Sequence, residues 1–221
     1  MRINKFIALA SGMSRRRADA VVEQGKVLVN GQLAQPGQDV AEADTVAVNG
    51  RELHAPAQTR TIIFNKPVGV VVSRDGQGSP TIYDVLPTEF SQLKPVGRLD
   101  KDSSGLLLLT NDGQLAQTLT HPSHKKTKEY EVRLNKPLTP AHRQVVSGQG
   151  VQLSDGLSRL GLEPLGEDGR GWRVRMHEGR NRQIRRTFLA LGYSVNTLHR
   201  TQFGSYTLDG LQDGAYQEAQ A

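Results

Sequence analysis

The chain has 221 residues, a formal net charge of +6 at pH 7 and no cysteine. This length suits one large domain or a medium domain with a small one, and the basic balance favours a polyanionic partner over a small neutral ligand. Without cysteine, disulfides and thiolate metal sites are excluded and a reducing compartment is expected. The start has no long apolar segment of a signal peptide, and no apolar run approaches membrane-spanning length. We therefore expect a cytoplasmic protein that does not associate with membranes.

The first fifty residues are predicted to form a compact unit of two helices and a hairpin. Apolar residues recur at helical spacing, Ser14 is a typical N-cap, and Asn30-Gly31 is typical of a tight hairpin turn. The predicted elements are helices over residues 3–12 and 14–25 and strands over residues 26–29 and 45–48. We assign residues 1–50 to this small domain and the polar residues 51–60 to a linker.

From Thr61 onward, strand and helix patterns are interspersed. The strand candidates are residues 61–64, 70–73, 106–110, 130–134, 172–176 and 194–199, and the helix candidates are residues 81–86, 114–120, 140–147 and 182–191. This order predicts an α+β domain over residues 61–221, with a mixed, mostly antiparallel sheet and flanking helices. The polar tail after Gly210 is expected to be frayed.

One acidic residue stands in a pattern that suits a nucleophile. Asp100 follows Gly97, Arg98 and Leu99 on a loop between two strand-like segments. Buried strands on either side would hold its carboxylate in place, and a nearby cation would keep it ionised. Taken alone, the tetrapeptide is more typical of a turn or a helix cap than of a nucleophile, so the catalytic interpretation depends on other segments.

Arginine is concentrated near the end of the second domain. Between residues 170 and 186 seven arginines face a single acid, Glu178; they are Arg170, Arg173, Arg175, Arg180, Arg182, Arg185 and Arg186. A solvated helix face would normally mix the two signs of charge. The segment therefore predicts an anion-facing groove, with Arg180 and Arg182 assigned to binding the polyanionic partner and one arginine available to pair with an aspartate.

A second basic cluster opens the second predicted helix. Arg15, Arg16 and Arg17 lie at the positive end of its dipole, where cations are mildly unfavourable for helix stability. Phosphate binding would explain them, and a solvated charged face is the alternative. Arg2–Ile7, Ser14–Asp19 and Gly25–Gly31 together resemble the S4-like RNA-binding domain. That resemblance implies RNA contacts that read shape and phosphate, made by Arg2, Lys5, Arg15, Arg16, Arg17 and Lys26.

The second domain resembles the RsuA/RluB-type family of bacterial ribosomal RNA pseudouridine synthases, from about Thr61 to Thr207. The motifs that carry the resemblance are Asn65–Gly69, Gly97–Asp100, Lys128–Val132 and Glu178–Arg186. It implies three catalytic residues: Asp100 as the nucleophile, Tyr130 against the target base and Arg185 as the ion-pair partner of the nucleophile. It further implies that Arg98 holds the flipped nucleotide and that Ile184 and Leu198 line an apolar uracil pocket.

The reaction implied by this family fits the residues. The C1′–N1 bond of uridine breaks, the uracil rotates and C1′ joins C5, so no atoms enter or leave and no cofactor or metal is expected. Attack of the carboxylate at C1′, attack at C6 and assistance to uracil departure all remain open, and the Tyr130 phenol could remove the C2′ proton in the last route. The base has to leave its helix to reach the site.

The expected partner is ribosomal RNA, free or in a pre-ribosomal particle, and the protein is expected to be a monomer. The segments around Arg185 and Leu198–Arg200 look closer to enzymes of 23S than of 16S rRNA, and Lys125, Lys126 and Lys128 are expected to contact backbone phosphates. One alternative is a non-catalytic RNA-binding or ribosome-assembly protein that retains the fold, which predicts a damaged nucleophile. Another is a carboxylate-dependent hydrolase, which would need a second acid or a metal cluster near Asp100.

Overall fold

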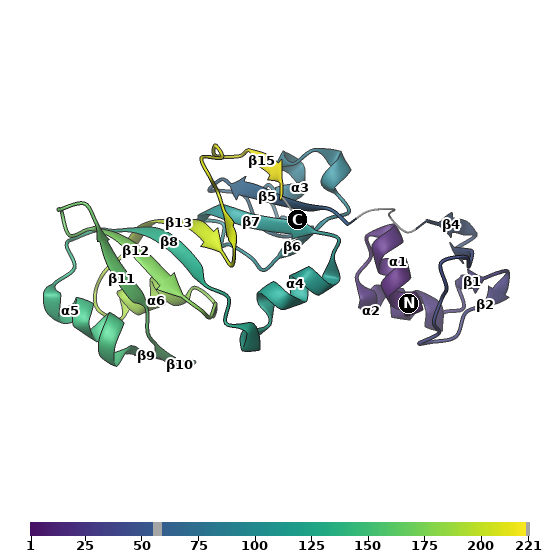
Figure 1. The fold of residues 1–221 in the computed structure, drawn as a ribbon, viewed down its shortest axis with the longest axis horizontal. Helices are drawn as coiled ribbons and strands as arrows, with labels where there is room; N and C mark the ends of the chain where they lie inside the picture. Colours follow the sequence, from purple (N-terminus) through teal and green to yellow (C-terminus); the bar gives the residue numbers. More distant parts are fainter. Residues whose placement is uncertain (55–58, 220–221) are drawn as a thin grey trace. The chain divides into compact units, whose positions relative to one another are not determined.

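The structure, a computed structural model, describes residues 1–54 and 59–219 (Figure 1). The chain divides into two compact units, the first Met1–Arg60 with Pro87–Lys94 and the second Thr61–Leu86 with Pro95–Ala221. Residues 87–94 therefore group with the first unit, although they lie within the sequence assigned to the second domain. None of the described helices is long and apolar enough to cross a membrane.

The first unit has the two helices and the hairpin that the sequence predicts. Its elements are α1 (Ile3–Ser11), α2 (Arg15–Glu23), β1 (Val27–Val29), β2 (Gln32–Leu33), β3 (Val46–Val48) and β4 (Arg51–Leu53), with sheet order β2-β1-β3-β4. The Ser14 hydroxyl caps α2 by accepting from the Arg17 N–H at 3.2 Å. The buried faces of both helices pack on Val27, Val46 and their neighbours to form the core of this unit.

Strand β4 was not predicted, because the linker was expected to begin at residue 51. Asn49 and Gly50 both have positive φ, at 52° and 77°, which suits a tight turn and returns the chain alongside β3. Arg51–Leu53 therefore belongs to the small sheet rather than to a linker. Residues 55–58 of the expected linker lie outside the described residues.

The second unit confirms the predicted α+β class with a mixed, mostly antiparallel sheet. The strand order is β11-β12-β8-β13-β7-β5-β15, with β14 paired to β13 and β6 paired to β7. The strands are β5 (Thr61–Lys66), β6 (Lys94–Val96), β7 (Ser104–Thr110), β8 (Lys128–Leu134), β11 (Gly161–Leu165), β12 (Gly171–Met176), β13 (Val195–Phe203), β14 (Tyr206–Thr207) and β15 (Tyr216–Glu218). Within this sheet, the pairing of β13 with β7 is parallel and the other pairings recorded between described strands are antiparallel.

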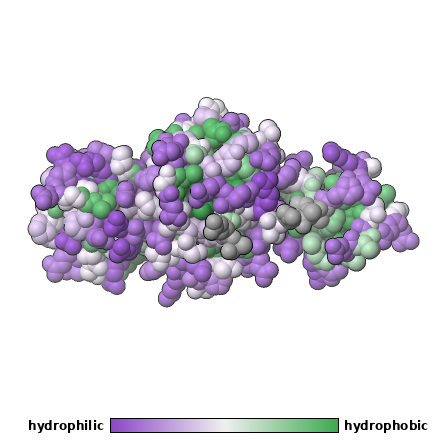
Figure 2. Space-filling model, turned by 45° about the horizontal axis from the view of Figure 1, so that its top comes forward, coloured by the Kyte–Doolittle hydropathy of each residue, from purple (hydrophilic) through white to green (hydrophobic). Residues whose placement is uncertain are grey.

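Short helices and one separate hairpin complete the chain. They are α3 (Ile82–Val85), η1 (Thr88–Phe90), α4 (Gly113–Thr120), η2 (Pro122–His124), α5 (Pro140–Gln144), the π-helical turn η3 (Val145–Gln149), the hairpin β9 (Val151–Leu153) with β10 (Gly156–Ser158), and α6 (Gln183–Leu189). The face visible in Figure 2 is mainly hydrophilic, with apolar residues in separate patches, as expected where side chains meet water.

Two predictions for the second unit are wrong. Residues 70–73 form no strand, since Val71 makes only an isolated bridge with Thr81. The tail is not frayed up to Glu218, because β15 pairs with β5 and Ala219 N–H donates to Thr61 O at 2.8 Å. A sheet edge offers a row of unpaired backbone donors and acceptors, and a polar segment can satisfy them as well as an apolar one.

The parallel contact between β7 and β13 depends on a glycine. Gly105 has φ +104°, and a Cβ there would lie 2.3 Å from Arg200 O. In the strand register Gly105 lies opposite Arg200, and Leu106–Leu109 beyond it are completely buried. The absence of a side chain at Gly105 thus lets β13 lie directly beside the strand that follows the Asp100 loop.

Lys66, the last residue of β5, is a fully buried cation. Its Nζ donates to Pro67 O at 2.7 Å. Burial lowers the pKa of Lys66 from 10.5 to about 8, although the charges of Asp213, Asp100 and Asp102 favour its protonated form. Holding this ammonium inside the protein therefore costs folding free energy at neutral pH.

We expect the stability of the protein to rise between about pH 8 and pH 10.5 because of Lys66. In that window the folded lysine has lost its proton, whereas the unfolded lysine still holds it, so the cost of the buried charge disappears. The pKa of Lys66 differs by about 2.5 between the unfolded protein, at 10.5, and the folded protein, at about 8. At roughly 1.36 kcal/mol for a tenfold change, the free energy of unfolding should rise by about 3 kcal/mol across this pH window. Urea unfolding at several pH values should show this rise in wild type and lose it in Lys66→Met. The exposed Lys136→Met is the control; identical pH profiles for the two variants would contradict the assignment.

Candidate active site

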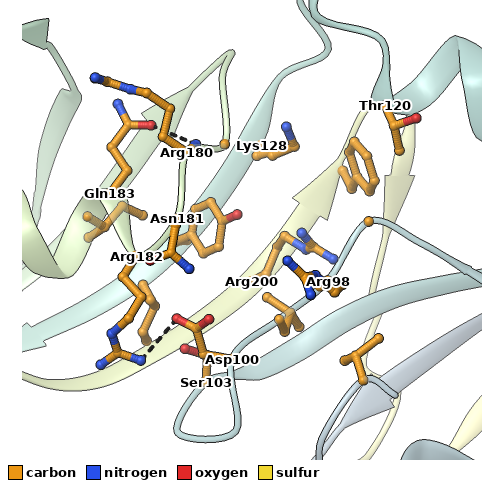
Figure 3. Close-up of a pocket in the computed structure, with 18 of the residues that line it drawn as sticks. Arg98, Asp100, Ser103, Thr120, Lys128, Arg180, Asn181, Arg182, Gln183 and Arg200 are labelled. Atoms are coloured by element: carbon orange, nitrogen blue, oxygen red, sulfur yellow. Dashed lines mark hydrogen bonds and ion pairs between the residues drawn. The ribbon is translucent and has the colours of Figure 1, made fainter. Parts of the chain in front are cut away.

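A cavity of about 1080 Å³ in the second unit is lined by the Asp100 loop, by β8, β12 and β13, and by the arginine-rich segment before α6 (Figure 3). Asp100, Tyr130, Ile184, Leu198 and Arg182 all line it. The structure therefore brings together residues that are 98 positions apart in the sequence. Among the described residues, no group of three or more His, Asp or Glu side chains could hold a metal ion.

The Asp100 loop is held by backbone hydrogen bonds at its base. Ser103 N–H donates to Asp100 O at 3.1 Å, and Gly69 N–H donates to Lys101 O at 2.8 Å. Leu99 is buried beside it, whereas the Asp100 side chain is 33% exposed. The Asn65–Gly69 segment, by itself no more than a turn, thus supports the loop that presents the Asp100 carboxylate to the cavity.

Arg182 forms the ion pair with Asp100, with 3.2 Å between its Nη1 and Asp100 Oδ2. The same guanidinium bridges both oxygens of Asp102, with Nη1–Oδ1 at 3.0 Å and Nη2–Oδ2 at 2.9 Å. This fork lowers the pKa of Asp102 through its hydrogen bonds and raises that of Arg182. Arg182 has φ +46°, a left-handed backbone uncommon for arginine, and strain of this kind gathers at functional sites.

The prediction that Arg185 pairs with the Asp100 carboxylate is not what the structure shows. Its Nη1 donates to Val195 O at 2.9 Å, its Nη2 donates to Asp102 O at 2.7 Å, and its Nε lies 3.4 Å from Asp102 Oδ2. Arg185 lies within the first turn of α6 and is mostly buried, and burial lowers its pKa. It is therefore tied to the backbone beneath the loop, while Arg182, just before the helix, reaches Asp100.

Part of the cavity lining is apolar and includes the aromatic ring of Tyr130. Tyr130 on β8, Ile184 on α6 and Leu198 on β13 are each buried and line the cavity. In the strand register Tyr130 lies opposite Arg200 of β13 and Val174 of β12. The arrangement offers a flat ring and two aliphatic side chains to a planar ligand next to the Asp100 carboxylate.

The arginine-rich segment offers fewer cations to an external anion than the sequence predicts, because many of its arginines form ion pairs within the protein. Arg180 donates to Asp155 Oδ1 at 3.0 Å, to Leu157 O at 2.9 Å and to Glu178 Oε1 at 3.1 Å. Two of these bonds hold the Arg180 guanidinium against the β9–β10 hairpin, so that fewer of its donors are available to RNA than the sequence predicts. Besides Arg182 and Arg185, three more arginines of the segment have acidic partners outside it: Arg173 and Arg175, both with Glu129 and Glu163, and Arg186, with Asp155.

Other cations remain accessible. Arg98 is exposed and lines the cavity next to the Asp100 loop. In the first unit the six expected RNA contacts are all exposed; they are Arg2, Lys5, Arg15, Arg16, Arg17 and Lys26. Two of them have protein partners, since Arg2 lies 3.8 Å from Asp39 and Arg15 donates to Asn4 Oδ1 at 3.2 Å.

Sequence reasoning missed three residues of this site. Asp102 had no predicted role, but it pairs with both Arg182 and Arg185. Lys66 is a buried cation within electrostatic range of Asp100, and no local pattern signals its burial. Arg200 lines the cavity and is buried on β13, one residue beyond the strand predicted over residues 194–199, and the sequence indicated no role for it in the site.

Comparison with known proteins places both units in described families. The model described as "RNA pseudouridylate synthase" matches residues 60–190, and the S4 domain model matches residues 1–51. The chain is similar to a solved structure described as a pseudouridylate synthase, with a TM-score of 0.71 and 31% identity, covering 100% of this chain and 96% of that one. These matches confirm the two resemblances drawn from the sequence.

Curated relatives agree with that result. Ribosomal large subunit pseudouridine synthase B of Xylella fastidiosa is 39% identical over 94% of this chain but only 46% of its own length, so the chain spans less than half of that relative. The protein of the same name in Bacillus subtilis is 34% identical, covering 98% of this chain and 91% of the relative. The dual-specificity RNA pseudouridine synthase RluF of Salmonella typhi is 35% identical, covering 98% and 75%. The chain therefore belongs to the RNA pseudouridylate synthase family and carries an S4 domain in its first 51 residues.

Proposed function

We propose that this protein converts a uridine of ribosomal RNA to pseudouridine, with Asp100 as the nucleophile. The observation that carries the proposal is one cavity lined by the Asp100 carboxylate, paired with Arg182, and by Tyr130 and the apolar side chains of Ile184 and Leu198. Several relatives are named for the large ribosomal subunit, which supports 23S rather than 16S rRNA as the substrate. Action in the cytoplasm as a monomer is part of the proposal.

In the proposed reaction the protein supplies a carboxylate, a cation and a surface for the base. The C1′–N1 bond breaks, the detached uracil turns against Tyr130, the C1′–C5 bond forms, and the proton on C5 is lost as N1 gains one. Asp100 attacks C1′ or C6, or assists departure of the uracil; Arg182 pairs with its carboxylate and orients it in each case. No atom is gained or lost by the substrate overall, so the chemistry calls for no co-reactant.

Asp102 and Arg185 act through Arg182 rather than on the substrate. The bidentate pair between Asp102 and Arg182 holds the guanidinium in one orientation, and Arg185 ties the Asp102 backbone to β13 through Val195. Positioning of this kind matters because small displacements of a reacting group cost large factors in rate. The exposed cations of the S4 domain contribute phosphate contacts to the rest of the RNA.

Mapping of pseudouridines tests this proposal most directly. We expect wild-type protein to create one new pseudouridine in 23S rRNA, and Asp100→Asn to lower the rate by about 10³-fold or more while RNA affinity and folding are kept. Asp209→Asn, an exposed change outside the cavity, should behave as wild type. No new site on naked rRNA or on partly assembled subunits would instead favour a non-catalytic RNA-binding role. A site in 16S rRNA would overturn the choice of subunit.

The roles of the two arginines can be separated by kinetics. Arg182→Ala removes the cation that touches Asp100, and we expect kcat to fall about 10²-fold with little change in RNA affinity. Arg186→Ala, which removes a cation paired with Asp155, is the control and should leave kcat near wild type. Thermal unfolding verifies that each variant is folded. A larger loss of kcat in Arg185→Ala than in Arg182→Ala would support Arg185 as the partner of Asp100, as the family resemblance implies.

The basic helix of the S4 domain should set the salt dependence of RNA binding. Replacing Arg15, Arg16 and Arg17 with Ala should reduce the slope of log Kobs against log salt by roughly 0.7 to 0.9 for each phosphate that the helix no longer neutralises, with kcat at saturating RNA unchanged. A triple variant of three exposed cations of the second unit that lie outside both the cavity and the arginine-rich segment, Lys136, Arg143 and Arg159, matches the change in charge. If the two triple variants have the same slope of log Kobs against log salt, this helix does not bind RNA phosphates.

A further inference from the structure

Arg200 is a buried cation in the wall of the cavity whose hydrogen bonds are incomplete. The residue is 2% exposed; its Nε donates to Leu106 O at 2.7 Å, and its Nη2 is buried without a hydrogen-bond partner among the described residues. Its backbone is fixed by the close approach of Gly105. Figure 3 shows its guanidinium on the cavity side of β13. A buried donor without a partner is costly, and such groups usually have a ligand or a role.

A second cation lies at the same place. Lys128 on β8 lies opposite Phe203 in the strand register, with its Nζ 5.2 Å from the centre of the Phe203 ring; the Arg200 Cζ lies 5.0 Å from that centre. Burial lowers the pKa of Lys128, and the positive charge of Arg200 lowers it further. Two like charges therefore share one aromatic ring at the edge of the cavity.

Neither cation has an acidic partner at ion-pair distance within the described part of the chain. The Lys128 Nζ donates to the backbone oxygen of Glu178 at 3.3 Å, and the Arg200 Nε bonds the Leu106 carbonyl. This contrasts with Arg182 and Arg185, which are engaged by Asp102 in the same site. The Glu178 charge favours the protonated form of Lys128 from beyond ion-pair distance, and the same carboxylate already pairs with Arg180. The two cations still repel each other, and an anion placed between them would offset that cost.

We propose that Arg200 and Lys128 form a phosphodiester-binding subsite that holds the RNA backbone next to the target nucleotide. Arg200 lies directly opposite Tyr130 in the β8–β13 register, so a phosphate bound there would adjoin a base stacked on that ring. Arginine and lysine donors suit phosphate oxygens, and an RNA strand entering the cavity brings such a group with every nucleotide. The inference rests on the proposed function, since it concerns RNA bound in the same cavity.

The test measures RNA binding without turnover. Asp100→Asn protein and its double variants are titrated with protein-free 23S rRNA over a range of salt concentrations. Lys128→Met removes the charge but keeps an apolar chain against Phe203. Lys136→Met is the matched control, because Lys136 also lies over an aromatic ring, 4.9 Å from the centre of Tyr193, but outside the cavity. Lys128→Arg tests whether another cation restores binding, and Lys128→Gln serves as a second neutral variant if Met is not tolerated.

We expect Lys128→Met to reduce the slope of log Kobs against log salt by about 0.7 to 0.9, and Lys128→Arg and Lys136→Met to leave it unchanged. Equal slopes for Lys128→Met and Lys136→Met would overturn the subsite and leave the two cations as packing groups of Phe203. In RNA whose modified uridine has been mapped, a neutral methylphosphonate at one of the two flanking linkages should weaken binding of Asp100→Asn about tenfold more than one placed elsewhere. Equal effects would also overturn it.

Failure of this subsite and failure of the proposed function are separable. If wild type forms no pseudouridine in the same rRNA, the proposed reaction is wrong, whereas the comparison of salt slopes still decides whether Lys128 meets a phosphate. If wild type modifies the RNA and the slopes do not differ, the reaction stands and the subsite is wrong.

Discussion

The close approach of β7 and β13 at Gly105 is the contact on which the rest of the site depends. Because no side chain stands at Gly105, the backbone of Arg200 lies directly against the strand that begins just after the Asp100 loop. The segment leading into β13 contains α6 and the Arg182 that precedes it. One pair of parallel strands thus sets the nucleophile candidate against its cation, and β8 on the other side of β13 adds Tyr130.

Charges in the cavity divide into two groups with different partners. Asp100 and Asp102 are matched by Arg182 and Arg185, so this part of the site is held rigid by the protein itself. Arg200 and Lys128 bond backbone carbonyls and have no acidic partner within the described residues. An ion-pair network formed within the protein suits the placement of a reacting carboxylate. Cations that have no acidic partner at ion-pair distance among the described residues suit the binding of a polyanion. The proposed reaction uses the first group, and the proposed phosphate subsite uses the second.

Counting arginines along the sequence predicted a basic groove that the fold only partly provides. Arg173 and Arg175 meet Glu129 and Glu163 across neighbouring strands, and Arg180 and Arg186 meet Asp155 at the β9–β10 hairpin. These acids lie outside the segment in which the charges were counted. Local charge density therefore overstated the number of arginines available to RNA, and it overlooked Arg200, whose isolated position in the sequence hid its place in the cavity wall.

The sequence by itself determined the local elements and the family motifs. Helical spacing and the Ser14 cap depend on neighbouring residues, and so they could be predicted from local patterns. The roles expected of Asp100, Tyr130, Ile184 and Leu198 came from the family motifs, and all four residues line the cavity. Only the tertiary structure decided which arginine touches Asp100, that Lys66 is buried and that the tail pairs with β5. Each of these depends on contacts between segments tens of residues or more apart, where burial and strand pairing select partners that no local pattern specifies.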